Sequence, residues 1–580
     1  MRTTFGVLWC LLALSTAAAS PQFLDQNWSE DDRQWFYTTP QGSKLIPYAW
    51  ALALERDDQT LWVANLDRFG FLPNGASTVN PDGLPVGIVR DDQHLGITCA
   101  ACHTNQVDFR GTTYQIDGAP TNASLWDFLK DLGDSLDATA KSASNDRFRR
   151  FATRVLGAND TPARRAKLYA EVKKFNDYFS TFVAASKPNT AWGRARTDAF
   201  GMIFNRVTSI DLKIPSNSRR PDAPVSYPFL WDTSWHNKVQ WNGSAPNSFA
   251  VERLARNVGE VLGVFAEIDI RKPTILHPFY KSTAKRLNLL EIEDRLSDLR
   301  APKWQPAFGA IDEAKRARGQ AIYGRQCLSC HAIATPGRRQ SIVMTPLSVV
   351  GTDPQMATVA ATRQARTGVL KGVREFILLG SKMGESAGAG TITLNAVIGA
   401  ILSPVSLQAS NTEAPQAEAA PLGEAEADSQ DPDRERLRSQ LLAGPLEEGD
   451  AQAESPQASV REELEISLKA LGARKKTTDA TEVAYKARPL DGIWATAPYL
   501  HNGSVPTLWD LLLPVAQRPA KFHVGSRELD PVKVGFDSSA GAETFLFDTT
   551  ATGNSNAGHE WGTSLTDADR AALIEYLKSL

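Results

Sequence analysis

The sequence has little of what marks several common classes of protein. Cysteine and methionine occur five times each in 580 residues, and the charges nearly balance, which leaves a formal net charge of −3. This balance gives no electrostatic reason to expect nucleic acid or an anionic membrane as a partner. Beyond the N-terminal segment, no apolar run reaches the roughly 20 residues that a membrane-spanning helix needs. We therefore expect no membrane span, and a length sufficient for about two or three globular domains.

The N-terminus has the three parts of a secretory signal peptide. The basic residue Arg2 precedes an apolar segment at 5–14, and small residues occupy 15–20. This arrangement predicts a signal peptide over residues 1–20, and hence a protein that is periplasmic or secreted. A buried N-terminal helix is the alternative, but a short apolar core followed by small residues is more typical of a signal peptide. Cys10 would leave with this segment.

The four remaining cysteines form two pairs, each followed at once by a histidine. The two motifs are Cys99-Ala-Ala-Cys102-His103 and Cys327-Leu-Ser-Cys330-His331. C-x-x-C-H is the attachment signature of c-type haem, because two thiols one turn apart can add to the porphyrin vinyl groups while the histidine ligates the iron. Redox dithiol pairs and zinc sites are the alternatives, and zinc is disfavoured because neither pair has a second pair at finger spacing. We predict two covalently bound haem c groups, with His103 and His331 as proximal ligands.

The second motif has the surroundings of a small cytochrome domain. Residues 312–326 predict an amphipathic helix that runs into this motif, and Thr566 and Asp569 resemble a capping box before an apolar stripe in the last helix. We expect a C-terminal cytochrome c domain at 305–580, whose first and last helices pack across each other. An N-terminal haem domain with loop-rich extensions would occupy 21–304. The predicted fold is mainly α, with two c-type cytochrome domains and long ordered loops.

The rest of the chain varies in pattern. Gly and Pro precede the first motif, so no long helix is expected there, whereas helical patterns lie around 122–136 and 162–184. Residues 215–250 are rich in Pro, Ser, Asn and Trp and predict an ordered loop. Residues 406–460 are rich in Ala, Glu, Pro, Gln and Asp. They predict a solvated, poorly ordered acidic insertion, with a partner-docking segment as the alternative.

The sixth ligand of each iron decides its chemistry, since two strong ligands favour electron transfer and an open face can bind oxygen species. His559 lies in a glycine-containing loop just before the last helix and is a candidate for the C-terminal haem, with a surface position as the alternative. By residue type alone, His501 is more often a structural turn histidine, and a dense aromatic segment such as that around Trp231 more often packs than relays electrons. The rival ligands are the thioethers of Met344, Met356 and Met383.

These features together resemble the bacterial dihaem cytochrome c peroxidase superfamily, and within it the rubber oxygenase branch. The resemblance to the superfamily is carried by both haem motifs, the segment 498–503 and the last helix. The resemblance to the rubber oxygenases is carried by the segments 80–87, 95–105, 224–231, 239–243 and 529–536.

The resemblance implies roles for the site residues. His103 would be the proximal ligand of a reactive N-terminal haem, while His331 and His559 would be the axial ligands of an electron-storing C-terminal haem. Trp231 would lie near or between the haems, and His501 would be a site histidine without an assigned role. An aromatic residue would close the distal face of the reactive haem, and calcium would lie between the haem domains. The aromatic candidates are Phe229, Trp231, Trp241 and Phe249.

We therefore expect an exported, haem-dependent oxidoreductase. The N-terminal haem would activate oxygen or peroxide, and the C-terminal haem would supply or hold an electron. The substrate would be an apolar, polyisoprene-like hydrocarbon, and an electron-donor protein would be a further partner. Two alternatives stay open. One is a dihaem cytochrome c peroxidase that reduces hydrogen peroxide, and the other is an electron-transfer cytochrome without a substrate of its own.

Overall fold

The computed structural model describes residues 20–274, 276–377, 379–403 and 483–580. Of the expected signal peptide, only Ser20 is among them, and the acidic insertion expected at 406–460 lies outside them. Within the described ranges, no helix is both long enough and apolar enough to cross a membrane.

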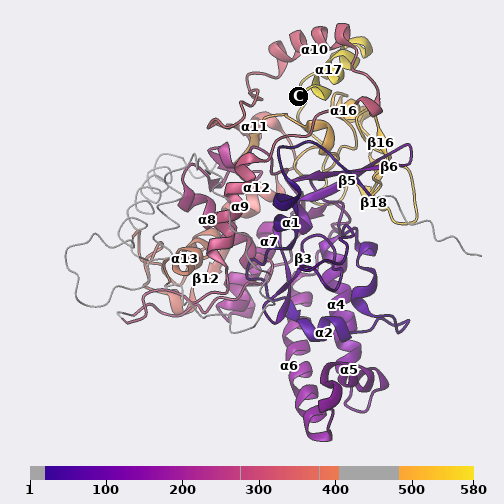
Figure 1. Ribbon diagram of the computed structural model, residues 1–580. Helices are drawn as coiled ribbons and strands as arrows, with labels where there is room; N and C mark the ends of the chain where they lie inside the picture. The colour runs from indigo at the N-terminus through magenta and orange to yellow at the C-terminus, as the bar shows by residue number, and fades with distance from the viewer. Residues whose placement is uncertain (1–19, 275, 378, 404–482) are drawn as a thin grey trace, which may run out of the picture.

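Helices of the N-terminal half build an arm that projects from the rest of the chain (Figure 1). The arm contains α4 (Leu125–Ala140), α5 (Asp146–Leu156) and α6 (Pro162–Ser186), with α2 (Tyr48–Ala53) packed on α5. The start of α6 shows why the helices begin where they do. The Thr161 hydroxyl accepts a hydrogen bond from the Arg164 N–H, and Pro162 occupies the first turn, where it needs no donor. The helical patterns expected around 122–136 and 162–184 are confirmed.

Short strands join the helices into small sheets. The three-stranded sheets are β1 (Gln22–Phe23), β6 (Thr112–Asp117) and β5 (Thr104–Phe109), and β2 (Ile46–Pro47), β4 (His94–Ile97) and β3 (Ile88–Asp91). The two-stranded sheets pair β7 (Arg196–Thr197) with β8 (Val225–Ser226), β9 (Lys238–Val239) with β10 (Ala245–Pro246), β11 (Val343–Pro346) with β14 (Ala484–Ala487), β12 (Gln364–Arg366) with β13 (Ser386–Gly388), β15 (Lys521–Val524) with β18 (Phe545–Asp548), and β16 (Leu529–Asp530) with β17 (Gly535–Phe536). Only β1 and β6 run parallel among these described pairs.

These strands make the architecture mixed rather than clearly mainly α. Sequence periodicity could not reveal them, because several are two residues long and too short to alternate. The loop expected at 215–250 is ordered and contains three such strands and short 3-10 turns. The division into two cytochrome domains stays a prediction.

The first C-x-x-C-H motif follows a strand rather than a helix, in agreement with the sequence. The hairpin of β3 and β4 pairs Ile88 with Ile97, and both side chains are buried. The chain then turns into α3 (Cys99–Cys102) and leaves through the hairpin of β5 and β6. Gly87, with φ 75°, permits this close turn, since a Cβ atom there would lie 2.0 Å from the backbone nitrogen of Ala101.

The middle of the chain is helical and packs beside the first motif. The helices that pack together here are α7 (Ala199–Phe204), which continues as a π-helix over Asn205–Asp211, α8 (Ala250–Gly263), α9 (Arg286–Asp298) and α13 (Ala389–Leu402). On α8 the apolar residues Val251, Leu254 and Val258 are buried. The shorter helices are α1 (Glu30–Thr38), α11 (Leu347–Val350), α12 (Gln355–Thr362) and α16 (Leu508–Leu511).

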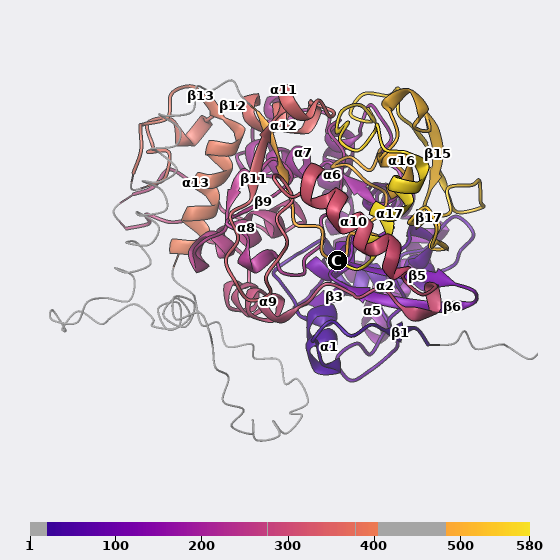
Figure 2. The ribbon, with the colours of Figure 1, turned by 90° about the horizontal axis from the view of Figure 1, so that it is seen from above.

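The expected cytochrome-like helices α10 (Glu313–Gln326) and α17 (Asp567–Lys578) lie side by side near the C-terminus (Figure 2). Both helices are confirmed, and Thr566 caps α17 as expected. Their backbones meet closely at Gly319, where a Cβ atom would lie 2.0 Å from the carbonyl oxygen of Ala572. This contact places the second motif, at the end of α10, beside the apolar face of the last helix.

Gly319→Ala should therefore destabilise the protein. The added methyl group would overlap the α17 backbone, and forcing apart packed elements costs about 1–3 kcal/mol. The matched control is Gly324→Ala in the same helix, where nothing lies within 4 Å of the added atom, so the change should stabilise by roughly 0.5–1 kcal/mol through helix propensity alone. Urea unfolding followed by circular dichroism measures both. Equal shifts in the two variants would contradict the close contact.

Candidate functional site

The first C-x-x-C-H motif lines a cavity of about 180 Å³. The walls come from the hairpin before the motif, from α7, α8 and α9, and from the loop that precedes α8. Most of the lining is apolar, as suits the faces of a porphyrin ring. The apolar lining residues are Ile97, Leu125, Ala199, Phe200, Met202, Ile203, Val225, Pro228, Phe229, Leu230, Val239, Trp241, Val261, Val264, Ile292 and Leu296.

His103 enters this cavity in an orientation suited to a metal ligand. Its Nδ1 donates a hydrogen bond to the carbonyl oxygen of Pro228 at 2.8 Å, which leaves Nε2 for a ligand. Burial lowers the pKa of His103 to about 4, so the imidazole is neutral. A neutral ring, oriented through its other nitrogen, is the usual state of a metal-ligating histidine. His103 and the thiols of Cys99 and Cys102 line the same cavity, so this donor set fits a covalently attached haem.

The thiols lack the character of a redox pair. The four cysteines among the described residues form no disulfide, and burial raises the pKa of Cys99 and Cys102 to about 12 and that of Cys327 to about 11. Redox-active C-x-x-C pairs instead have a lowered thiol pKa. In the described part of the chain, no group of three or more His, Cys, Asp or Glu side chains is placed to hold a metal ion. The geometry thus favours haem attachment over a dithiol or zinc, and calcium stays a prediction.

One edge of the first cavity is polar. Gln240 donates from Nε2 to the Glu260 carboxylate at 2.8 Å, and the Gln240 backbone lies in the left-handed region with φ 63°. Such a conformation in a non-glycine residue persists only where the surroundings impose it, which is common at functional sites. Burial raises the pKa of Glu260, although the nearby Arg256 opposes this. Glu260 therefore keeps its proton to a higher pH than an exposed glutamate does.

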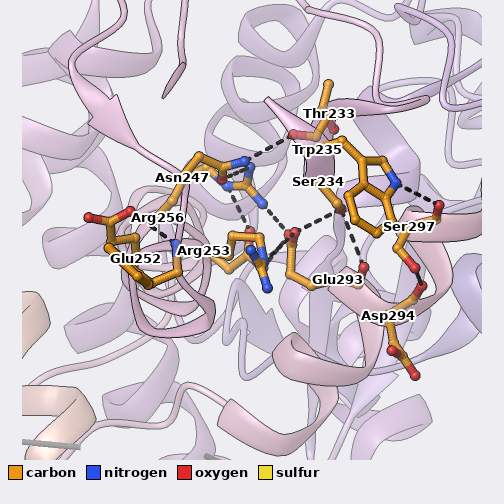
Figure 3. A network of polar contacts seen from close by, with 12 residues as sticks. Thr233, Ser234, Trp235, Asn247, Glu252, Arg253, Arg256, Glu293, Asp294 and Ser297 are labelled. Carbon is orange, nitrogen blue, oxygen red and sulfur yellow. Dashed lines mark hydrogen bonds and ion pairs between the residues drawn. The ribbon is translucent and has the colours of Figure 1, made fainter. Parts of the chain in front are cut away.

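Arg256, on the same edge, is fixed by a buried network that joins α8, α9 and the loop before α8 (Figure 3). Its guanidinium pairs with the Glu293 carboxylate and donates to Asn247 Oδ1 at 2.9 Å. Ser234 donates to Glu293 at 3.1 Å. Burial alone would raise the pKa of Glu293, but the positive charges of Arg256 and Arg253 lower it, so the ion pair keeps its charges. The network holds in place the loop that carries Gln240.

The second motif lines a separate cavity of about 170 Å³, next to α10 and α17. Its apolar lining includes two residues of the stripe expected on the last helix, Leu573 and Leu577. The other aliphatic lining residues are Val350, Ala487, Leu490, Ile493, Leu500, Leu508, Leu511 and Leu512. The thiols of Cys327 and Cys330 also face this cavity, so it fits a second attached haem.

Two imidazoles lie together in the second cavity. The ring centroids of His331 and His559 are 6.1 Å apart. Two metal–nitrogen bonds of about 2 Å each, with roughly 1 Å from each nitrogen to its ring centre, need this separation. His331 Nδ1 donates to the carbonyl oxygen of Arg488 at 2.7 Å, which again leaves Nε2 for a ligand. Burial lowers the pKa of His331, and that of His559 to about 3, so both rings are neutral.

The glycine-containing loop before the last helix is held against the end of α11, and this places His559. The His559 N–H donates to the Val350 carbonyl oxygen at 2.7 Å, and Arg518 donates to the Gly558 carbonyl oxygen at 2.8 Å. Gly558 has φ 74°, and a Cβ atom there would lie 2.3 Å from the backbone of Gly351, so only glycine permits this approach. The rival ligands Met344, Met356 and Met383 line neither cavity.

The two cavities share a wall. Trp241 and Lys486 line both of them. The Trp241 indole donates to the Ser226 carbonyl oxygen at 2.8 Å, and the Lys486 backbone N–H donates to the Trp241 carbonyl oxygen at 2.9 Å. The loop before α8 and the strand β14 are therefore fastened together at the point where the cavities meet.

The aromatic residues expected near the haems take different places. Trp231 is fully buried and lines neither cavity; it stacks on Phe229 with ring centroids 4.7 Å apart and donates to the Asp491 carbonyl oxygen at 2.9 Å. Of the candidates for the distal face, Phe229 and Trp241 line the first cavity, while Trp231 and Phe249 do not. Trp231 thus packs on Phe229 without lining a cavity, and Trp241 is the tryptophan that lines both cavities.

His501 lies in the second cavity rather than the first. Its ring stacks on Tyr485 with centroids 4.0 Å apart, and burial lowers its pKa to about 3. Its carbonyl oxygen accepts a hydrogen bond from the Ser226 N–H at 2.9 Å, which ties this turn to β8. A neutral, stacked imidazole at this place closes the side of the second cavity.

Sequence reasoning missed Gln240, Glu260, Arg256 and Lys486. A signal existed for two of them, since Arg256 and Glu260 are four residues apart and lie on one face of α8. Charged residues at that spacing usually mark a solvated face, and only the packing of the loop before α8 over this face shows that it is buried. Lys486 carries no comparable signal, because its surroundings are made by residues distant in sequence.

Comparison with known proteins agrees with the geometry. Residues 484–523, which include Lys486, Arg488 and His501, match the family described as RoxA-like, cytochrome c-like, and this match implies haem c binding. The chain is 31% identical to the uncharacterized protein y4iJ of Sinorhizobium fredii (strain NBRC 101917 / NGR234), over 96% of this chain and 93% of that protein. A second protein of that organism, y4iM, is 39% identical over 18% of this chain and 29% of its own length.

His559→Ala should change one haem only. Loss of one axial imidazole from the second cavity would convert that iron from low spin to high spin, whereas the first cavity, which His559 does not line, would be unaffected. Absorption and electron paramagnetic resonance spectra of the purified protein measure this. The matched control is His277→Ala, an exposed histidine that lines neither cavity and should leave both spectra unchanged. A change in both haems, or in neither, would contradict the assignment.

Proposed function

We propose, from the premise that this chain belongs to the same family as y4iJ and is related to the RoxA-like cytochromes, that it is an exported haem-dependent oxidoreductase with two unlike haem sites. The first cavity would hold the reactive haem, with His103 as its proximal ligand. The second would hold an electron-storing haem between His331 and His559. This arrangement is the one expected of the dihaem superfamily that the motifs resemble.

The proposal rests on a difference between the two cavities in the number of histidines that line them. The second contains two imidazoles at the separation that one iron needs, whereas His103 is the only histidine among the described residues that line the first. Haem iron with two strong axial ligands transfers electrons, and haem iron with one open face binds and activates oxygen or peroxide. The first cavity would therefore be the place of substrate chemistry.

Gln240 and Glu260 would supply the proton chemistry of the first cavity. Reduction of hydrogen peroxide to water consumes protons, and burial raises the pKa of Glu260, so its carboxyl group keeps its proton to a higher pH than an exposed glutamate does. The hydrogen bond from Gln240 holds the Glu260 carboxyl group in one orientation. The guanidinium of Arg256 on the same edge would stabilise negative charge that develops there.

Trp241 would connect the two sites for electrons. Its indole lies in the wall that both cavities share, and Arg488 lies over its ring with the guanidinium carbon 5.1 Å from the ring centre. A cation over the ring face fixes the indole by cation–π attraction, in addition to the hydrogen bond to Ser226. The resemblance placed Trp231 near or between the haems, whereas the shared lining supports Trp241 for this position.

The lining of the first cavity supports an apolar substrate. Aliphatic and aromatic side chains such as Phe200, Ile203 and Phe229 dominate it, so a polyisoprene-like hydrocarbon, cleaved with oxygen as the oxidant, is the substrate that we propose. A second candidate is hydrogen peroxide reduction with an electron-donor protein, for which the Gln240 and Glu260 pair would supply protons. An electron-transfer cytochrome without a substrate would need Met202, the one thioether in the described lining, as a sixth ligand.

Oxygen uptake separates these activities. We expect the purified protein with both haems to consume oxygen in the presence of polyisoprene latex and to release shorter carbonyl-terminated fragments. Turnover of hydrogen peroxide with a reduced small cytochrome, without any oxygen uptake on polyisoprene, would favour the peroxidase instead. Absence of both activities would contradict the oxidoreductase proposal.

Glu260→Gln should lower kcat for hydrogen peroxide reduction by about 10²-fold, because a positioned proton donor typically contributes 10²–10⁴-fold. The wild-type rate should fall as pH rises through the raised pKa of Glu260, since the carboxyl group must carry its proton to act as an acid. This alkaline limb should be absent from the variant. The control is Glu543→Gln, an exposed glutamate that lines neither cavity. An unchanged pH profile in Glu260→Gln would exclude this role.

A further inference from the structure

Lys486 is a buried cation in the wall between the cavities. The residue is 9% exposed, and its side chain lines both cavities. Its Nζ lies 5.9 Å from the centre of the Trp241 ring, and no carboxylate of the described residues lies within ion-pair distance of it. Arg488, on the same stretch of chain, is equally buried; its guanidinium donates to Thr496 at 2.9 Å and likewise pairs with no carboxylate of the described residues.

The two cations also act on a buried imidazole. His236 is 1% exposed, and neither of its ring nitrogens has a hydrogen-bond partner. Burial lowers its pKa to about 3, and the positive charges of Lys486 and Arg488 lower it further. Lys486 and Arg488 are thus two buried cations that form no ion pair with a carboxylate of the described residues. The Asp491 carboxylate acts on Arg488, where its charge opposes the lowering of the guanidinium pKa by burial.

A buried ammonium group without an anion is unfavourable, because removal from water is compensated only by a paired charge. Haem c, the group that fits each cavity, carries negative charges that could pair with Lys486. Haem c is attached by its vinyl edge, so its two propionate carboxylates stay free at the opposite edge of the ring. Carboxylate is also the group that lysine and arginine pair with most directly.

We propose that Lys486 binds a propionate carboxylate of the haem in each cavity, and so forms one cationic bridge between the two haems. The proposal rests on the proposed function only in requiring haem in both cavities. Because a nearby positive charge favours addition of an electron, Lys486 would raise the reduction potential of both irons together. A change of charge at one haem would then alter the reduction potential of the other through the Lys486 side chain.

The charges around Lys486 support this assignment. Among the protein groups alone, burial together with Arg488 and Arg256 lowers the pKa of Lys486 to about 7. A carboxylate beside the ammonium group would raise that pKa and keep the group charged. Trp241, whose carbonyl oxygen accepts the Lys486 backbone N–H, holds the base of the side chain between the two cavities.

The test is a spectroelectrochemical redox titration of the protein with both haems bound. In Lys486→Met both reduction potentials should fall relative to wild type, and both should become dependent on pH between about 5 and 8, since unpaired propionates then take up protons and the potentials rise as pH falls. Lys486→Arg, which keeps the charge, should restore wild-type potentials without this pH dependence. Lys486→Gln should behave as Lys486→Met does and serves where the methionine variant does not fold.

Two controls establish whether Lys486 acts through the propionates. Lys371→Met removes an exposed lysine that lines neither cavity and should move neither potential. Sodium acetate added to wild type at constant ionic strength should also leave both potentials unchanged; a shift would mean that an external anion, not a propionate, pairs with Lys486. A shift of one haem alone, or of neither, in Lys486→Met would overturn the bridge. Protein without haem would instead contradict the proposed function.

Discussion

Both candidate sites depend on one kind of interaction, a hydrogen bond from a buried imidazole Nδ1 to a backbone carbonyl oxygen. His103 makes it to Pro228 and His331 makes it to Arg488. Each bond fixes the neutral tautomer and turns Nε2 toward the cavity. The two acceptors also lie next to Phe229 and near Lys486 in the chain, so each bond fastens a haem motif to an element that forms the wall between the cavities.

This constraint explains how similar motifs come to occupy unlike sites. The first cavity is closed by the loop before α8, which brings aromatic and amide groups to the lining, and no second histidine of the described residues lines that cavity. The second is closed by the loop before α17, which a glycine contact allows to approach α11 and which delivers His559. The two motifs are alike, but different loops close the two cavities. This difference would leave one iron with an open face for reaction and the other with two histidine ligands for holding an electron.

Local signals sufficed for part of this picture. The two C-x-x-C-H motifs, the helices α10 and α17 and the position of His559 before the last helix follow from spacing, capping and periodicity within short segments. The short strands were missed because two residues cannot show an alternating pattern. The choice between Trp231 and Trp241 could not be made either, since both belong to one aromatic segment and only the fold decides which faces the cavities.

Groups that act through long-range packing were invisible in the sequence. In the sequence, Glu260 has the spacing of a solvated helix face, and only the fold shows that the loop with Gln240 covers it. Lys486 looks like an ordinary strand lysine, and only the fold shows that it lines both cavities. The proposed division of labour requires that the two irons be unlike. Electron paramagnetic resonance of the oxidised wild-type protein should show one low-spin signal from a bis-histidine haem, integrating to one iron per chain, and a second, different iron. Two equivalent low-spin signals would contradict it.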